Sequence, residues 1–292
     1  MKECPECVYW RLILQLYPQN ELHTTAFQCK FAMRLGLPQE GVYHLNMIFF
    51  SNFLSRWLLS LTLICASSHG AMNPQDIIKK ADIARYPDGQ FSFFVKVTDR
   101  DENSDSKETV YLVHTKDTNN SLVETKAPEK LRGRKLLMKQ HDLWMFLPNL
   151  KKPTRVGFEQ RLTGEVSNGD LARTNFADDY QAKIISEENI DGALCYKLLL
   201  TATHKEAAYR RIVYWVSKEG FFPVQVNFYA LSGKLLKTGK YSGIKSVLSK
   251  PRVTQLVITD ALHQKRQSTL NYFNFKKASY DDTFFSKESL SD

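Results

Sequence analysis

Residues 210–238 read "RRIVYWVSKEGFFPVQVNFYALSGKLLKT", and their pattern decides the fold class. Two apolar segments, residues 210–216 and 222–230, are separated by Glu219-Gly220, and the second is followed by Ser232-Gly233. Alternating apolar residues predict strands that bury one face, and short glycine-containing connections predict tight turns between them. The stretch therefore predicts consecutive antiparallel strands.

The same pattern extends along most of the chain. The segment 91–97 alternates strictly, and Asp191-Gly192 is a further hairpin signal. Other strands are expected at residues 109–115, 121–126, 135–140, 142–148, 180–188, 194–202, 234–244, 252–261 and 268–277. This many short strands joined by short turns predict a mainly β fold built on one antiparallel sheet that curls on itself.

One amphipathic helix is expected before the strands, over residues 74–86. Asn73-Pro74 is a favourable start, since asparagine caps helices and proline suits the first turn, and Pro87 ends the run. The apolar residues at helical spacing are Ile77, Ile78, Ala81 and Ala84. A second covering element, a loop with a short helix, is expected within residues 151–179.

A single good helix cannot cover every apolar strand face. The sheet therefore either closes and fills its own interior or leaves a concave face open to an apolar ligand. From the residues alone, a closed sheet that fills its own interior is the more common of these two outcomes.

The segment 47–71 has the three parts of a secretory signal. Arg56 precedes an uncharged apolar run, residues 57–66, and small residues follow it in "ASSHGA". The run is shorter than the ~20 residues of a spanning helix. We expect a signal peptide at 47–71, one domain at 72–292, and a start codon assigned too far upstream at 1–46. A buried core helix and an uncleaved anchor are weaker alternatives.

The composition limits the classes of partner expected for an exported chain. The net charge of +9 would suit nucleic acid in another compartment, but an exported protein meets anionic lipid headgroups instead, so no nucleic-acid partner is expected. A plain basic surface is at least as good an interpretation. Cys195 is the one cysteine after residue 71, so no disulfide is expected within the domain.

The sequence carries no recognisable enzyme motif. It has no G-x-S-x-G, no H-E-x-x-H and no glycine loop for phosphate. The histidines of the expected domain are not at metal-ligand spacing: His114, His141, His204 and His263. We expect no metal, no cofactor and no catalytic activity.

From Trp144 onward the chain resembles the LolA-like outer-membrane lipoprotein-sorting proteins. The similar segments are "LWMFLPNLKKPTRV" (143–156), "LTGEVSNGDL" (162–171), "DDYQAKIISEENIDGALCYKLLL" (178–200) and the opening stretch. The resemblance implies an incomplete antiparallel barrel covered by the N-terminal helix and a short helical lid. It also implies a periplasmic, monomeric carrier of lipidated proteins or lipids, with an inner-membrane exporter and an outer-membrane acceptor as partners.

Two groups of residues are predicted to contact cargo or membrane. The residues expected to line a lipid cavity are Phe91, Phe93, Val95, Val97, Trp144, Phe146, Tyr214, Phe222, Val224, Val226 and Phe228. Those expected to contact headgroups or a membrane surface are Lys234, Lys237, Lys240 and Lys245. Each also fits an ordinary core or a solvated edge.

Two other functions fit the sequence. An integral outer-membrane β-barrel would explain the signal and the strands, but lysines on both strand faces and the "SLSD" end argue against it. A secreted hydrolase with an unrecognised site is the second alternative.

Overall fold

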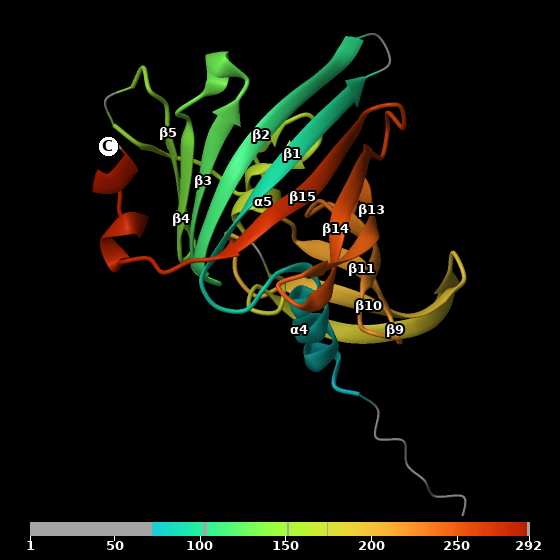
Figure 1. Cartoon of the computed structure of the whole chain (residues 1–292). Coiled ribbons are helices and arrows are strands. Elements are labelled where there is room, and N and C mark those ends of the chain that lie inside the picture. The colour runs from blue at the N-terminus through green and yellow to red at the C-terminus, as the bar shows by residue number, and fades with distance from the viewer. Residues whose placement is uncertain (1–71, 102–103, 151, 174, 291–292) are drawn as a thin grey trace, which may run out of the picture. The chain divides into compact units, whose positions relative to one another are not determined.

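The computed structural model describes residues 72–101, 104–150, 152–173 and 175–290, so the expectations for 1–46 and 47–71 lie outside the described residues. One antiparallel sheet of 13 strands forms most of the structure (Figure 1). Its order is β6-β5-β4-β3-β2-β1-β15-β14-β13-β12-β11-β10-β9. In the part of the chain described, β6 and β9 are the two ends of the sheet and do not pair, so the curled sheet stays open as expected.

The strands of the large sheet are β1 (Phe91–Asp101), β2 (Ser104–Asp117), β3 (Asn120–Ala127), β4 (Lys135–Lys139), β5 (Asp142–Phe146), β6 (Thr154–Arg155), β9 (Tyr180–Ile190), β10 (Ala193–Ala202), β11 (Arg211–Ser217), β12 (Pro223–Tyr229), β13 (Leu235–Val247), β14 (Lys250–Asp260) and β15 (Gln267–Lys277). A small second sheet pairs β7 (Arg161–Thr163) with β8 (Val166–Ser167). The helices are α4 (Pro74–Arg85), α5 (Asn168–Ala172) and the 3₁₀ turns η1 (Glu129–Leu131), η2 (Asp282–Phe285) and η3 (Glu288–Leu290).

Glycine-containing turns join the strands where the sequence predicts them. Asp191 and Gly192 have φ of 50° and 89° between β9 and β10, which is the left-handed pair that a tight hairpin requires. Gly220 and Gly233, with φ of 72° and 83°, occupy the turns on either side of β12. The local turn chemistry therefore sets the up-and-down order of β9 to β13.

Helix α4 begins and ends close to its predicted bounds. The Asn73 side chain accepts a hydrogen bond from the backbone N–H of Gln75 at 2.9 Å, which caps the helix. At the other end, Arg252 of β14 donates hydrogen bonds to the carbonyls of Ile83 and Tyr86, where helix ends favour a cation. The helix is therefore anchored to the sheet as well as capped. None of the described helices is long and apolar enough to cross a membrane.

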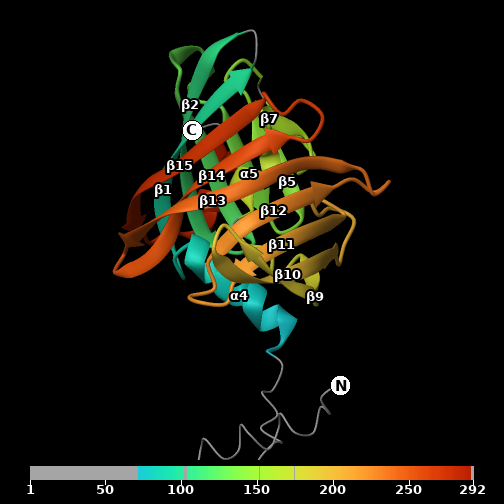
Figure 2. The same cartoon turned by 90° about the vertical axis from the view of Figure 1, so that its right-hand side faces the viewer.

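The concave face of the sheet holds two adjoining apolar clusters. One gathers the inward side chains of β1 to β5, β14 and β15 with Leu171 of α5, and the other gathers those of β10 to β12 with Ile77 and Ile78 of α4. Ala208 and Tyr241 pack against both. In Figure 2 the sheet curls around α5, while α4 lies at one end of the curl.

Trp144 and Phe146, which are predicted to line the lipid cavity, lie on the face of the sheet opposite to Phe93. They pack with Phe285 and Leu290, which are 1% and 0% exposed, in a cluster under the C-terminal turns η2 and η3. Neighbouring residues of a strand point to opposite faces, and in β5 it is Leu143 and Met145 that face inward. The alternation in the sequence is present in β5, but the face that points inward is opposite to the predicted one.

A β-bulge in β12 changes the face of a second predicted cavity residue, Val224. Trp215 pairs with Gln225, but Val216 pairs with Pro223, which leaves Val224 as an extra residue. The bulge turns Val224 toward the outer cluster of Cys195 and Trp215, while Val226 stays in the concave cluster. Phe222 precedes β12 and is partly buried in the turn beside Gly220.

Phe285→Ala should destabilise the domain by about 3–5 kcal/mol, because it leaves a cavity under the C-terminal turns. Urea unfolding measures the change. Leu231→Ala is the control, because Leu231 is 83% exposed and should change stability little. Equal effects of the two substitutions would show that η2 does not cover the sheet in solution.

Candidate functional site

Three covering segments lie over the concave face of the sheet: α4, α5 and the loop that follows α5 (residues 175–179). The space between them and the sheet is almost filled. At its centre lies a cavity of about 30 Å³, enough for roughly one water molecule. Its walls combine aromatic and charged side chains, among them Arg85, Asp170, Arg173, Tyr209 and Tyr241. A ligand larger than water therefore requires the covering segments to move.

Two larger hollows flank this centre. One of about 350 Å³ lies between α4 and β1–β2, lined by Ile83, Tyr86, Phe91 and Thr118 among others. The other, of about 260 Å³, lies on the concave face near Tyr111 and Thr125. These two residues pair at the end of the β2–β3 hairpin that is far from its turn, whereas Thr118 lies in the turn. The apolar walls of this second hollow include Val123, Leu136, Met145, Leu147 and Leu162. Ligand pockets usually measure about 300–1,000 Å³, so the first hollow falls within that range, the second lies just below it and the centre is far smaller.

A buried ion pair joins α5 to the sheet. Lys237 of β13 lies 2.6 Å from a carboxylate oxygen of Asp170 and donates to the backbone carbonyl of Glu165 at 2.8 Å. The Tyr209 hydroxyl donates to the other oxygen of Asp170 at 2.9 Å. Each member of this network therefore has a partner, as buried charges require.

Lys237 is thus misassigned in the headgroup prediction. Its register partner is Phe228, whose side chain faces inward, and Lys237 is only 6% exposed. Lys234, Lys240 and Lys245 are exposed, and Lys240 pairs with Asp191 at 3.3 Å. Contact of these three lysines with a membrane stays a prediction.

A second buried pair lies at the end of α4. Asp82 lies 3.4 Å from Arg85 and accepts hydrogen bonds from the backbone N–H groups of Phe176 and Ala177 at 2.8 and 2.9 Å. The Arg85 guanidinium also lies over the Phe176 ring, 4.5 Å from its centre. Burial raises the pKa of Asp82 to about 6, although Arg85 and the two N–H groups act in the opposite sense. Asp82 therefore fastens the loop after α5 to α4.

A third pair crosses the gap between the two ends of the sheet. Arg173 Nε lies 2.9 Å from Asp179, next to β9. Its other nitrogens donate to the carbonyls of Thr118 and Gln140, in the β2–β3 and β4–β5 turns, at 2.9 Å each. Burial lowers the pKa of Arg173, while Asp179 opposes the shift. One side chain thus connects the start of the edge strand β9 with two turns in the other half of the open sheet.

The remaining predicted cavity residues are buried on the concave face: Phe91, Phe93, Val95, Val97, Tyr214, Val226 and Phe228. Phe228 borders the central cavity, and Phe91 borders the hollow beside α4. Whether any of the seven contacts a ligand stays a prediction. The sequence does not predict the charged residues that line the central cavity, because Arg85, Asp170 and Arg173 look like ordinary surface residues in it.

Comparison with known proteins defines the family. A family model described only as that of an uncharacterised protein matches residues 117–292. A crystal structure of a LolA superfamily protein from Nitrosomonas europaea is 36% identical, with a TM-score of 0.72, and covers 75% of this chain and 100% of its own. No curated protein matches the sequence. The chain belongs to the LolA superfamily.

Two more distant structures share the fold. A domain described as outer-membrane lipoprotein-sorting, from Vibrio parahaemolyticus, is 20% identical with a TM-score of 0.66, over 75% of this chain and 98% of its own. A DUF1329 family protein from Desulfovibrio piger is 22% identical with a TM-score of 0.65, over 74% of this chain and 97% of its own.

Lys237→Ala should lower the free energy of unfolding by about 3–5 kcal/mol, because it leaves Asp170 buried without its cation. Urea unfolding at neutral pH measures this. Lys240→Ala is the matched control on the same strand: its ion pair is exposed and contributes at most about 1 kcal/mol. A loss no larger than that of the control would contradict the burial of Lys237.

Asp82 should make stability depend on pH between about 6 and 4. Its native pKa of about 6 lies above the ordinary value of 3.8, so the native state binds the proton first and stability rises as pH falls. The full gain is about 3 kcal/mol for a shift of about two units. Unfolding of wild type and Asp82→Asn at pH 7 and 4.5 tests this. The stability of wild type relative to Asp82→Asn should increase at pH 4.5, and a constant difference would refute it.

Proposed function

We propose that this protein is a periplasmic carrier that binds acyl chains of lipoproteins or lipids between its curled sheet and the covering segments. The observation that carries the proposal is an open, inward-facing apolar sheet in a LolA superfamily member whose covers are fastened by polar contacts. The sorting role described for the Vibrio parahaemolyticus domain agrees with it.

The concave face offers the surface that an acyl chain needs. Its clusters place aromatic rings side by side, with Phe93 stacked on Phe275 at 5.0 Å and near Tyr86 at 5.5 Å. Removing apolar surface from water contributes about 25 cal/mol per Å². Transfer along such a face requires no covalent chemistry, so no enzymatic step is part of the proposal.

Binding of a whole chain requires the covers to open. The central cavity, with room for about one water, separates the two larger hollows. Moving α4 away from residues 175–177 breaks the two hydrogen bonds to Asp82 and connects the hollow beside α4 with the centre. In this proposal the described structure is the closed state of the covering segments.

Partners and location complete the proposal. A signal peptide at 47–71 would deliver a monomeric protein to the periplasm. There an inner-membrane exporter would load the cargo, and an outer-membrane acceptor would remove it. The exposed lysines Lys234, Lys240 and Lys245 suit contact with anionic headgroups during loading or release.

Displacement of a fluorescent fatty acid tests the carrier function. Met145→Glu should weaken binding by about tenfold or more, since it places a charge in the hollow of about 260 Å³ where the chain would lie. Met145 is only partly buried beside an open hollow, so water can hydrate the charge and the fold should survive, which circular dichroism checks.

Ile244→Glu is the control, because Ile244 is 55% exposed on β13 and binding should be unchanged. Absence of binding by the wild type, with a range of acyl lengths and with lipid extracts, would refute the carrier function. Mass spectrometry of lipid extracted from the purified protein would identify the cargo.

A further inference from the structure

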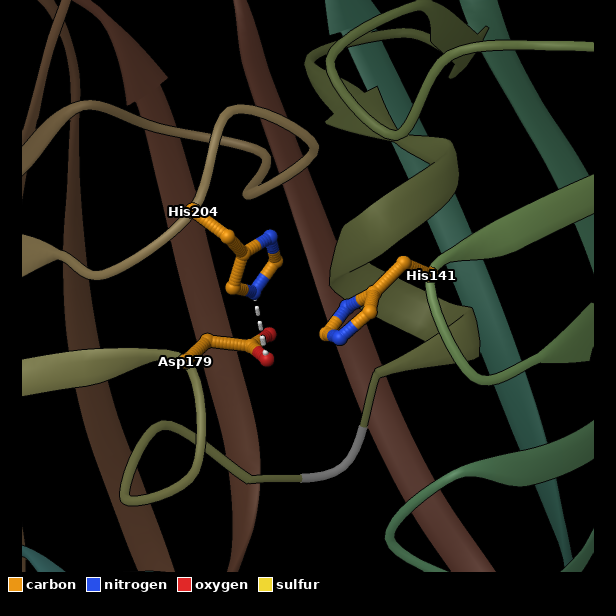
Figure 3. Close-up of side chains that lie close together, drawn as sticks. All are labelled: His141, Asp179 and His204. Carbon is orange, nitrogen blue, oxygen red and sulfur yellow. Dashed lines mark hydrogen bonds and ion pairs between the residues drawn. The ribbon is translucent and has the colours of Figure 1, made fainter.

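Three side chains from distant parts of the sequence converge at the gap between the ends of the sheet. They are His141, Asp179 and His204, and one ligand atom from each lies within 4.8 Å of the others (Figure 3). His204 Nε2 lies 3.0 Å from Asp179 Oδ1, and the two imidazole rings are 4.1 Å apart between centres. Two imidazoles and a carboxylate form a donor set that zinc-class ions prefer.

The fold places these residues on opposite sides of the gap. His141 lies in the β4–β5 turn, beside Gln140, whose carbonyl Arg173 binds. Asp179 directly precedes β9 and His204 follows β10, and the start of β9 pairs with the end of β10. The cluster therefore lies beside the Arg173 contact. It links the same two parts of the sheet, the β4–β5 turn and the start of β9.

The distances fit a metal with little rearrangement. In a tetrahedral site with bonds of about 2.0–2.1 Å, neighbouring ligand atoms are about 3.3 Å apart. The His204–Asp179 distance of 3.0 Å is already close to this value. His141 has an exposed side chain at the end of a turn, so its ring can rotate to shorten the remaining distances.

The surroundings provide the outer contacts that metal ligands usually have. The second oxygen of Asp179 is held by Arg173, which leaves Oδ1 for an ion. His204 Nδ1 is buried and lies 3.5 Å from the Glu206 carboxylate. A metal on Nε2 would favour the tautomer that carries its proton on Nδ1, facing Glu206.

We propose that His141, Asp179 and His204 bind one divalent transition-metal ion of the zinc class, which fastens the two ends of the open sheet together. Water completes the coordination, with Glu206 as the nearest further carboxylate. Arg173 neutralises part of the carboxylate charge, so the site has moderate affinity and the ion can be removed by chelators.

Titration of the chelator-treated full chain with Zn²⁺ by calorimetry tests the site. Every sample carries Cys4→Ser, Cys7→Ser, Cys29→Ser and Cys65→Ser, because thiolates bind zinc strongly, whereas Cys195 is buried. His141→Gln and His204→Gln should each weaken binding by about tenfold or more, since even outer-shell losses cost about 10–100-fold. The exposed His263→Gln, in the β14–β15 turn, is the matched control and should bind as the parent does.

Thermal melting gives the second readout. Zn²⁺ should raise the melting temperature of the parent and of His263→Gln, but not that of His141→Gln, which should fold normally because His141 is exposed. Equal zinc affinity in all three histidine variants would place the ion elsewhere. Absence of saturable binding by the parent would show that the cluster is only a hydrogen-bonded pair beside a free histidine. Either result would overturn the proposal without bearing on acyl-chain binding.

Discussion

Among the described residues the two end strands of the sheet, β6 and β9, do not pair, and the rest of the structure depends on how that gap is bridged. A large twisted sheet curls, and a fully closed barrel would satisfy both edges by pairing them. Here Arg173 links the start of β9 to the other half of the sheet, with one contact to Asp179 beside β9 and two to carbonyls in the turns of β2–β3 and β4–β5. A side chain can release such contacts without unravelling a strand, so the opening can change while the ladder stays intact.

The covers follow the same principle. Helix α5 is joined to β13 through Asp170 and Lys237, and the loop after it is joined to α4 through Asp82. Buried ion pairs cost much desolvation and often contribute little net stability, although removing one partner is expensive. Such contacts favour one position of the covers without making the closed state deeply stable. That balance suits a lid better than continuous apolar packing would.

The turns and the presence of the strands were predictable from the sequence because both depend on local chemistry. Asp191-Gly192 fixes a hairpin by its backbone conformation, and Asn73-Pro74 fixes the start of α4, whatever surrounds them. The family resemblance then decided between a closed and an open sheet, which alternation alone could not do. Fold class and element order were therefore accessible from the sequence.

Face assignments within strands depend on longer-range information. The inward face of β5 is set by the C-terminal turns, which cover Trp144 and Phe146 from outside. Val224 changes face because of a bulge, and alternation in the sequence continues unbroken through it. Lys237 and the cluster of His141 and His204 depend on partners tens of residues away, which no local spacing reveals.

The chemistry of the interior bears on release as well as on binding. Four tyrosines bring hydroxyl groups into the concave space: Tyr209, Tyr214, Tyr241 and Tyr272. Burial raises the pKa of Tyr241 to about 12, so the residues around Tyr241 face a neutral phenol. An acyl chain in contact with these groups and with Arg85 gains less than it would in a wholly aliphatic core, because polar groups gain nothing from contact with hydrocarbon. In the proposed carrier, an interior of mixed polarity would protect the chain from water and keep the affinity low enough for an acceptor to compete.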